Sequence, residues 1–295
     1  MITAALVKEL RDLTGAGILD SKKALVETDG DIEKAVIWLR EKGMASAAKK
    51  SGRIAAEGLS KVVFELNRAV IVEINSETDF VAKNELFLEL LEKVSMAILF
   101  NKPASVEEAL ELEFDGKKVS ELITNATSVI GEKISLRRFD IINKNENEVF
   151  GVYMHMGGKI SAVAVLENAD EEMAKDIAMQ VASMSPTFIS REYMDATFIE
   201  KERNIQISIA DNDESLKGKP EKVLQGIVEG RLNKSLKDIS LVDQVYFKDP
   251  GLNVEKYLKT KDAKVVNFVR YAVGEGIEKR EDDFAAEVMA QVASK

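Results

Sequence analysis

The sequence predicts an α+β protein made of several compact units. The chain has 295 residues, which is longer than a typical single domain. At roughly 100 to 200 residues per domain, this length suggests two or three units. Hydrophobic residues make up 45% of the chain and charged residues 31%, a balance that is typical of globular proteins. Along the chain, apolar residues first recur at the spacing of a helix and then at every second position, as in a strand, and both patterns occur again later. This order predicts helices packed on antiparallel sheets.

The first residues predict two short helices. Thr3 is a good N-cap residue, and Gly15 and Gly17 are expected to end the first helix. A second helix is predicted from Asp20 to near Gly30. The apolar residues of the first helix recur at helical spacing and form one stripe: Leu6, Val7, Leu10 and Leu13. The stripe predicts that this helix buries one face.

A third short helix is predicted after Asp31, which caps it, and Gly43 is its expected end. Its apolar face is formed by Ile32, Ala35, Val36 and Leu39. Residues 44–60 are rich in small side chains and have little periodicity, so they predict a linker. We therefore expect residues 1–53 to form a three-helix domain that includes the start of this linker.

Beyond the linker, the pattern predicts a β-hairpin that is followed by a helix. Asn67 and Arg68 supply the turn between the strands. Apolar residues alternate on both sides of this turn: Val62, Phe64, Leu66, Val70, Val72 and Ile74. Asn84 then caps an amphipathic helix, further helical stretches follow, and residues 134–142 predict a strand. We assign residues 54–144 to the first part of a core.

The same hairpin-and-helix pattern recurs later in the chain. Residues 149–154 and 160–166 predict strands on either side of a turn at Gly157 and Gly158. A helix is predicted next, over residues 170–184. We interpret the recurrence as a divergent internal repeat.

The two copies differ between the hairpin and its helix. The first copy carries a polar loop with an aromatic residue at 76–80, whereas the second passes through Asn168 and Ala169. An extra polar loop with an aromatic residue therefore occurs in one copy only. We assign residues 145–195 and 236–263 together to the second part of the core.

Residues 196–235 predict a helical hairpin inserted into this second part. Residues 211–220 form its polar turn, and Pro220 begins the second arm. Apolar residues are expected to form the seam between the arms as in a coiled coil: Phe198, Ile205, Ile209, Val223, Ile227 and Leu232. Residues 264–295 predict a C-terminal module with a strand, a glycine turn and a final helix at 282–293.

The sequence lacks the residue patterns of common active sites. The absence of cysteine excludes disulfides, thiolate metal sites and cysteine nucleophiles, and it suits a reducing compartment. The one histidine, His155, excludes paired-histidine zinc motifs, and its place beside a glycine turn predicts a surface or interface position. Neither glycine-rich phosphate-binding motif occurs. We expect no catalytic residue, no metal and no cofactor.

The charge of the chain argues against nucleic acid as a direct partner. A net charge of −10 and a pI near 5.0 favour repulsion from a phosphate backbone. Residues 1–53 carry a net charge of +2, so a mildly basic head precedes an acidic remainder. The sequence shows neither a membrane-spanning stretch nor an export signal. We expect a cytoplasmic protein without membrane contact.

Stretches at both ends of the chain and in its core carry a family resemblance. Residues 10–25 read LRDLTGAGILDSKKAL, and residues 73–84 read EINSETDFVAKN. Residues 273–279 read VGEGIEK, and DFAAEV follows at 283–288. In order and spacing these blocks resemble the elongation factor Ts family of bacterial type, over nearly the whole chain.

The resemblance implies both a layout and a function. The layout comprises a ubiquitin-associated-like three-helix head, a two-part α+β core, a helical hairpin insertion and a C-terminal module. The function is that of a guanine nucleotide exchange factor in translation elongation. Such a factor binds elongation factor Tu with GDP, disrupts its Mg²⁺ and phosphate site, and promotes GDP release and GTP loading without covalent catalysis. The contacts would involve the GTPase and β-barrel domains of elongation factor Tu.

The resemblance assigns the loop of Thr78, Asp79, Phe80 and Val81 to the partner's GTPase domain, where it would dislocate Mg²⁺. Phe80 would act as a wedge between partner helices, and Asp79 as a nearby charged or hydrogen-bonding group. The local sequence also allows a simpler interpretation, in which Thr78 or Asp79 caps the next helix and Phe80 packs against it. The lack of this loop in the second repeat copy favours partner binding.

Two further sets of residues are implied to contact the partner. One set surrounds the first turn of the head, where the glycines are also explained by an ordinary turn between helices: Leu13, Thr14, Gly15, Ala16, Gly17, Lys22 and Lys23. The other set lies at the second hairpin and would contact the β-barrel domain: His155, Met156 and Gly157.

Other interpretations stay open on the sequence. The chain could be an adaptor that binds partners through its ubiquitin-associated-like head and has no exchange activity. That interpretation leaves the loop at 76–80 without a task. A small-molecule enzyme is disfavoured by the missing motifs. The helical hairpin is expected either to self-associate or to contact the partner.

Overall fold

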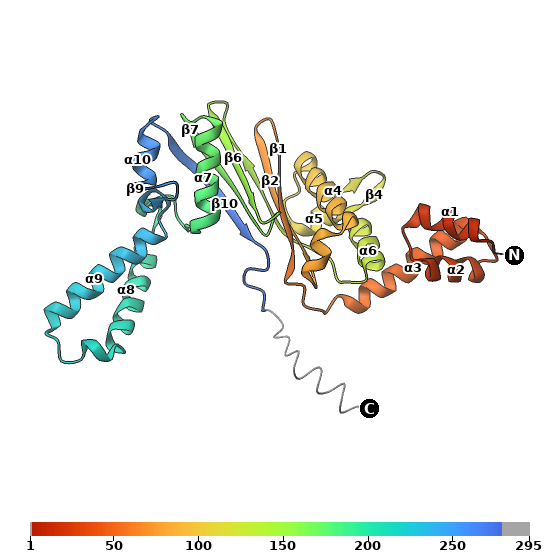
Figure 1. The fold of residues 1–295 in the computed structure, drawn as a ribbon, viewed down its shortest axis with the longest axis horizontal. Coiled ribbons are helices and arrows are strands. Elements are labelled where there is room, and N and C mark those ends of the chain that lie inside the picture. The colour runs from red at the N-terminus through yellow and green to blue at the C-terminus, as the bar shows by residue number, and fades with distance from the viewer. Residues whose placement is uncertain (1, 279–295) are drawn as a thin grey trace. The chain divides into compact units, whose positions relative to one another are not determined.

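The chain has a mixed α and β architecture, as the sequence predicts. The computed structural model describes residues 2–278, which divide into two compact units (Figure 1). Unit 1 takes in the residues up to Lys61, those of Val72–Phe139, and the described residues from Ala272 onward. Unit 2 takes in Val62–Ile71 and Asp140–Tyr271. Within residues 2–278, no helix is long and apolar enough to cross a membrane.

The N-terminal part of unit 1 is a bundle of helices. These are α1 (Ala4–Thr14), α2 (Ile18–Glu27) and α3 (Ile32–Lys50). The Thr3 hydroxyl accepts a hydrogen bond from the Leu6 N–H at 3.2 Å, and the Asp31 carboxylate accepts one from the Lys34 N–H at 3.0 Å. Both predicted N-caps are therefore confirmed. The fully buried side chains of the bundle are Leu10, Ala24, Leu25 and Ala35.

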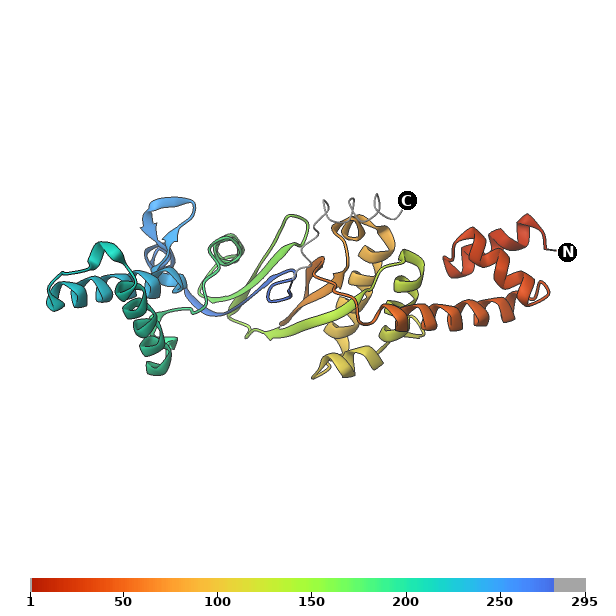
Figure 2. The same cartoon turned by 90° about the horizontal axis from the view of Figure 1, so that it is seen from below.

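Helix α3 corrects the predicted end of the third helix. It continues through Gly43 to Lys50, and Figure 2 shows it as one continuous helix. Gly43 is buried, and a Cβ atom at this position would lie 3.1 Å from the Ser128 hydroxyl oxygen. The glycine therefore serves a close approach between helices instead of ending one. The predicted linker over residues 44–60 is wrong at both ends, because the first strand already begins at Glu57.

The first hairpin and its helix are confirmed. The first sheet has the strand order β1-β2-β5, in which β2 is central. Helix α4 begins after Asn84, whose side-chain oxygen accepts a hydrogen bond from the Leu86 N–H at 2.9 Å. The elements in this stretch are β1 (Glu57–Glu65), β2 (Arg68–Ser76), α4 (Glu85–Asn101), α5 (Val106–Glu111), β3 (Glu113–Phe114), β4 (Lys117–Lys118), α6 (Val119–Ile130) and β5 (Ser135–Asn143).

The second hairpin and its helix form the centre of unit 2. Strands β6 (Glu148–His155) and β7 (Ile160–Glu167) pair antiparallel, and β10 (Lys264–Ala272) lies on the other side of β7. Helix α7 (Glu171–Met184) packs on β6 and β7. At Gly151 of β6, a Cβ atom would lie 1.8 Å from the Ala174 carbonyl oxygen, so the approach of α7 to the sheet requires glycine.

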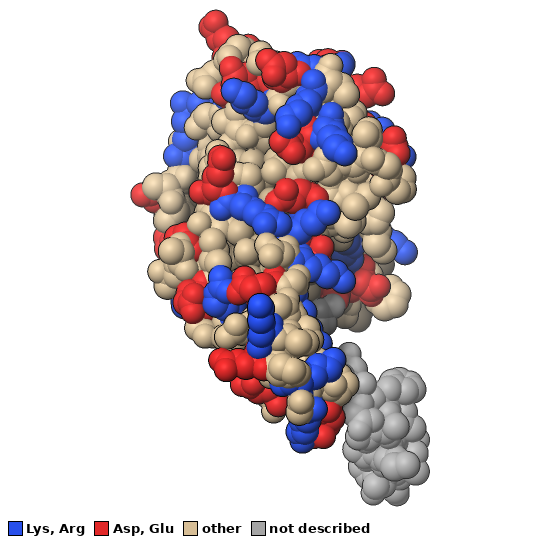
Figure 3. Space-filling view, turned by 90° about the vertical axis from the view of Figure 1, so that its left-hand side faces the viewer, with Lys and Arg blue, Asp and Glu red and all other residues tan. Residues whose placement is uncertain are grey.

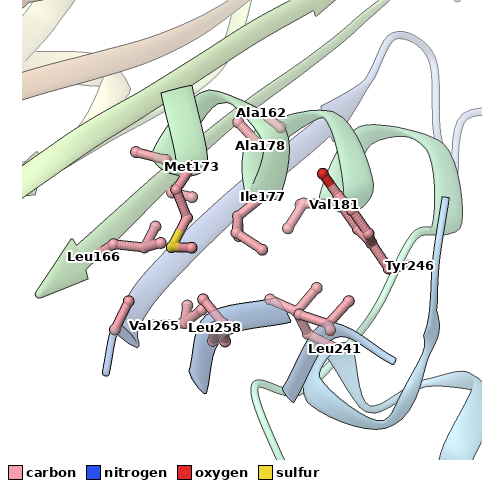
Figure 4. Close-up of a cluster of buried hydrophobic side chains, with 14 of the residues drawn as sticks. Ala162, Leu166, Met173, Ile177, Ala178, Val181, Leu241, Tyr246, Leu258 and Val265 are labelled. Atoms are coloured by element: carbon pink, nitrogen blue, oxygen red, sulfur yellow. The ribbon is translucent and has the colours of Figure 1, made fainter. Parts of the chain in front are cut away.

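The core of unit 2 lies between α7, its sheet and the segments that follow the helical hairpin (Figure 4). Ile177 and Val181 of α7 face Leu241 and Leu258, while Met173 lies beside Leu166. The smaller elements that close this core are η4 (Leu241–Asp243), β8 (Val245–Tyr246), β9 (Asp249–Asn253) and α10 (Val254–Lys259).

The two hairpin-and-helix patterns share a topology. In each, the second hairpin strand is central, a helix follows the hairpin, and a later strand pairs beside that central strand. The orders β1-β2-β5 and β6-β7-β10 therefore correspond strand by strand. This correspondence supports the internal repeat that the sequence suggests.

The predicted helical hairpin is formed by α8 (Ala196–Asp211) and α9 (Glu221–Asp238). Its seam is predicted in part: Phe198, Ile227 and Leu232 belong to the hydrophobic clusters of the hairpin, whereas Ile205, Ile209 and Val223 are 46–48% exposed. The buried contacts between the arms involve Phe198, Ile199, Ala210, Val228, Leu232 and Leu236. An ion pair between Arg203 and Glu229 joins the arms, and Arg231 of α9 pairs with Asp213 in the turn. Acidic and basic side chains are interspersed on the face shown in Figure 3.

The strand predicted in the C-terminal module is confirmed as β10, and a glycine-rich turn follows it. The final helix predicted at 282–293 lies outside the described residues. The finer division of the chain, with boundaries at residues 53, 144, 195, 235 and 263, stays a prediction.

Candidate partner-binding site

The loop after β2 is anchored at its beginning. The Thr78 N–H donates to Glu132 Oε2 at 2.8 Å, and the Thr78 hydroxyl donates to Glu132 Oε1 at 2.6 Å. The Ser76 hydroxyl donates to the Thr78 carbonyl oxygen at 2.9 Å. A 3-10 helix, η1 (Asp79–Lys83), continues the loop toward α4. Both the N–H and the carbonyl oxygen of Thr78 thus have hydrogen-bond partners, which fix the backbone at this residue.

The side chains of this loop have opposite environments. Val81 is buried, with 5% of its surface exposed, and it attaches the loop to the body of unit 1. Phe80 is 82% exposed, and Asp79 is exposed beside it. An aromatic ring and a carboxylate are therefore displayed to solvent from an anchored backbone.

The simpler interpretation of this loop holds only in part: Thr78 occupies the N-cap position of η1, but its side chain makes no capping hydrogen bond there. Helix α4 is capped by Asn84, and the Thr78 hydroxyl is engaged by Glu132. Phe80 does not pack against α4, because most of its surface is exposed. The local roles in capping and packing thus do not account for Thr78, Asp79 and Phe80.

Glu132 is not among the residues that the sequence predicts for this site. It follows Gly131, which ends α6 with a φ of 89°, and a charged residue after such an end is ordinarily a solvent-exposed loop residue. Its contact with Thr78 spans 54 positions in the sequence. Periodicity and local motifs carry no information about a contact of that range.

The turn between α1 and α2 holds the predicted head residues together. Gly15 ends α1 with a φ of 69°, and its N–H donates to the Arg11 carbonyl oxygen at 2.7 Å. The Thr14 hydroxyl donates to the Leu10 carbonyl oxygen and accepts from the Ala16 N–H. Gly17 begins α2 as its N-cap. The turn is thus closed by its own hydrogen bonds.

The apolar residues around this turn are exposed. Leu13 is 62% exposed. Ile18 and Leu19, which are not among the predicted site residues, are 58% and 82% exposed. The buried positions of α2 are Ser21, Ala24 and Leu25, so Leu19 lies off the buried face. An apolar leucine on the exposed face of an amphipathic helix is a sequence pattern that identifies Leu19 as a candidate contact residue. Lys22 and Lys23 are exposed on the same helix.

A shallow groove lies beside the turn on the same bundle. Apolar and basic side chains line it together: Ile2, Val7, Lys8, Arg11, Ile18 and Lys22. Lys23 is not among its lining residues.

The second-hairpin residues lie at the tip between β6 and β7, in unit 2. Met156 is 72% exposed with a φ of 49°, and Gly157 follows with a φ of 67°. The Tyr153 hydroxyl lies 3.0 Å from His155 Nδ1, and the two rings are 5.9 Å apart. Both ends of this contact are at the surface. The tip therefore displays a methionine and a histidine that is held by its neighbour.

A buried carboxylate lies in β2, close in sequence to the anchored loop. Glu73 is fully buried and accepts hydrogen bonds from Arg137 at 2.8 Å, Arg138 at 2.7 Å, the Gly274 N–H at 2.9 Å and Asn75 at 3.1 Å. Burial alone would raise its pKa, but the Gly274 N–H and the two guanidinium groups outweigh burial and lower the pKa below its ordinary value of 4.5. Glu73 is thus held ionised between β2, β5 and the glycine-rich turn.

Within the described residues, no group of three or more acidic or histidine side chains is arranged to hold a metal ion. The features that stand out are exposed apolar side chains on anchored turns. They form exposed surfaces on an α+β scaffold.

Comparison with known proteins specifies the class. The family model described as “Elongation factor TS” matches residues 77–275, which include the anchored loop, the second hairpin and the helical hairpin. The chain is 56% identical over 292 residues to “Elongation factor Ts” of Acholeplasma laidlawii (strain PG-8A), and the match covers 99% of each chain. It is 52% identical over 291 residues to “Elongation factor Ts” of Pediococcus pentosaceus (strain ATCC 25745 / CCUG 21536 / LMG 10740 / 183-1w), covering 99% of this chain and 98% of the relative.

The chain belongs to the elongation factor Ts family, and its role is that of a translation elongation factor. The two relatives extend the match to the head, which lies before the part that the family model covers.

Proposed function

We propose that this chain is the guanine nucleotide exchange factor for elongation factor Tu, and that it acts without covalent catalysis. The observation that carries the proposal is the loop at Thr78, where an anchored backbone displays Phe80 with 82% of its surface exposed. An exposed aromatic ring on a fixed backbone is suited to insertion into a partner, because little conformational freedom is lost on binding.

The proposed mechanism acts on the magnesium site of the partner's GTPase domain. Phe80 enters between elements that hold the Mg²⁺ ligands, and Asp79 supplies a carboxylate nearby. Magnesium requires nearly ideal octahedral geometry, so a displacement of about 1 Å removes much of its contribution to phosphate binding. GDP then dissociates, and the complex persists until GTP is loaded.

Further contacts give the exchange factor its affinity for the partner. The head, which we propose to be ubiquitin-associated-like, docks on the GTPase domain through Leu13–Gly17, Lys22 and Lys23. The exposed Ile18 and Leu19 extend this apolar surface. The tip with His155, Met156 and Gly157 contacts the β-barrel domain.

The helical hairpin is proposed to be a short coiled coil with an additional exposed apolar face. Ile205 and Ile209 are one helical turn apart on α8, and they line a shallow groove with Asn204, Ser208 and Asn212. This face is a candidate for self-association or for contact with the partner. We further propose a cytoplasmic location and an exchange reaction that needs no cofactor, nucleic acid or membrane.

A release assay tests the proposal. Elongation factor Tu loaded with a fluorescent GDP analogue is mixed with excess unlabelled nucleotide and with substoichiometric amounts of this chain. An exchange factor accelerates the loss of signal and is not consumed, so each molecule serves many partners. A ubiquitin-associated-like adaptor binds without acceleration. Release at the intrinsic rate, in the presence of demonstrated binding, contradicts the proposal.

A further inference from the structure

The anchored loop and the segment after α6 are joined by reciprocal side-chain-to-backbone bonds. Glu132 accepts from the N–H and the hydroxyl of Thr78, at 2.8 and 2.6 Å. In return, Glu77 accepts from the N–H of Lys133 at 2.5 Å. Each segment thus supplies a carboxylate that accepts a hydrogen bond from a backbone N–H of the other segment. A capping box at a helix start contains a similar reciprocal pair of side-chain-to-backbone hydrogen bonds.

A third segment joins this arrangement. The Arg53 guanidinium lies 3.2 Å from Glu77 Oε1, and the Lys133 ammonium donates to the Arg53 carbonyl oxygen at 2.8 Å. Arg53 and Glu77 form a partly exposed ion pair, which contributes little by itself. Glu132 instead contacts the loop itself: its two carboxylate oxygens accept hydrogen bonds from the N–H and the hydroxyl of Thr78, so it holds the loop backbone directly.

The position of these bonds determines what they control. Phe80 is two residues beyond Thr78 and 82% exposed, so the protein body does not fix its side chain directly. Its direction depends on the backbone between Thr78, where Glu132 holds the chain, and Val81, which is buried. Fixing the backbone of a loop costs conformational entropy, and a loop ordered before binding does not bear that loss on binding.

We propose that Glu132 is a positioning residue that orders the Thr78–Val81 loop in the free protein, so that Phe80 is presented to the partner in its binding geometry. This inference rests on the proposed function and deepens it, because it assigns the preordering to a residue outside the loop. Glu132 itself does not need to touch the partner.

The test compares Glu132→Ala and Glu132→Gln with a matched control, Glu111→Ala. Glu111 forms a surface ion pair with Lys118 at 2.6 Å in the same unit and does not contact the loop. The alanine variant is expected to slow assisted GDP release about 10-fold, the loss that corresponds to one charge-assisted hydrogen bond. The isosteric glutamine retains one acceptor oxygen and is expected to lie between alanine and the parent chain. The control is expected to match the parent chain.

Two further measurements separate positioning from general stability. Hydrogen exchange on the free protein is expected to show loss of protection at the Thr78 amide in the alanine variant, with unchanged protection in the core of α4. In a Phe80→Ala background, Glu132→Ala is expected to cause much less slowing than in the parent chain, because the main group that the ordered loop presents is already absent and only Asp79 remains.

The outcomes distinguish the inference from the proposed function. If Phe80→Ala slows release and neither Glu132 variant does, the positioning role is wrong and the exchange mechanism stands. Additive losses in the double variant, or lost protection throughout α4, would also overturn it, since Glu132 would then act on stability in general. If Phe80→Ala itself has no effect on release, both the inference and the proposed mechanism fail.

Discussion

Phe80 and Phe87 are seven residues apart and have opposite environments. Phe87 is fully buried in α4, whereas Phe80 is 82% exposed on the preceding loop. Burying a phenylalanine side chain stabilises a protein by about 1.5–3 kcal/mol, so Phe87 contributes that amount to the fold and Phe80 does not. The apolar surface of Phe80 remains available for a partner.

Phe80→Ala is therefore expected to leave the fold intact and to slow assisted GDP release by roughly 30-fold, the equivalent of about 2 kcal/mol for a central interface aromatic. Stopped-flow fluorescence with labelled GDP measures the rate, and urea unfolding verifies the fold. Phe100→Ala is the matched control, because Phe100 is 54% exposed on α4 in the same unit. Equal rates for the Phe80 and Phe100 variants would contradict the wedge role.

Glu73 shows what sequence periodicity leaves out. The alternation of Val70, Val72 and Ile74 places Glu73 on the opposite face of its strand, together with Ile71, and does not indicate what covers that face. In the structure β2 is buried on both faces, and Glu73 is covered by the turn at Gly274, some 200 residues later in the chain. Like the contact of Glu132 with Thr78, this contact between distant segments has no local sequence pattern.

The lowered pKa of Glu73 gives a pH dependence with a definite sign. Since its pKa in the folded state lies below the ordinary value of 4.5, the ionised group stabilises the fold fully above that pH and progressively less below it. Glu73→Gln is expected to lower the free energy of unfolding at pH 7 by about 3 kcal/mol, near the low end for breaking a buried pair, because both arginines are partly exposed.

Urea unfolding at pH values from 7 down to below 4.5 checks the prediction. The difference in the free energy of unfolding between Glu73→Gln and the parent chain is expected to shrink as the pH falls below 4.5. At low pH the Glu73 carboxylate of the parent chain is protonated and loses its own charge. Glu111→Gln, at an exposed ion pair, is the control and is expected to change stability little at any pH. A Glu73 difference that stays constant with pH would contradict the assigned role.

At the scale of elements, the sequence predicts helices and strands well and their partners less well. Period-two alternation identifies both hairpins, and cap residues identify the starts of α1, α3 and α4. Gly43 misleads because glycine marks helix ends and close approaches alike, and only the position of Ser128 decides between them. The hairpin seam misleads because α8 carries apolar residues on more than one face.

The packing of α3 on α6 can be tested at Gly43. Gly43→Leu is expected to lower the free energy of unfolding by about 1–3 kcal/mol, because the side chain must displace Ser128 or separate the helices. Gly43→Ala is the control, since about 1 kcal/mol of helix propensity offsets the tight contact of a single methyl group. Urea unfolding measures both variants. A leucine variant as stable as the parent chain would show that the helices do not approach closely here.

The head surface is tested by Leu19→Ala. Leu19 is 82% exposed, so its truncation is expected to leave the bundle stable and to weaken binding to elongation factor Tu about tenfold, or about 1.4 kcal/mol. Met44→Ala is the control, because Met44 is 57% exposed on α3. Isothermal titration calorimetry measures both affinities. If Leu19→Ala binds as tightly as the parent chain, the head docks through another surface or does not dock.

At the scale of the whole molecule, membership in the elongation factor Ts family and the proposed mechanism imply a thermodynamic cycle. If binding of this chain lowers the partner's affinity for GDP by some factor, then GDP must lower the partner's affinity for this chain by the same factor. Mg²⁺ acts in the same direction, because it stabilises the nucleotide site that the loop of Asp79 and Phe80 is proposed to distort. A passive adaptor has no such coupling.

Titration of this chain into elongation factor Tu under three conditions tests the exchange mechanism most directly. The account predicts the tightest binding without nucleotide, weaker binding with GDP, and the weakest binding with GDP and Mg²⁺ together. Each tenfold step corresponds to about 1.4 kcal/mol of coupling, which calorimetry resolves. Phe80→Ala is expected to bring the three affinities closer together, since it removes the group proposed to compete with the magnesium site. Equal affinities of the parent chain in all three conditions would contradict the exchange mechanism.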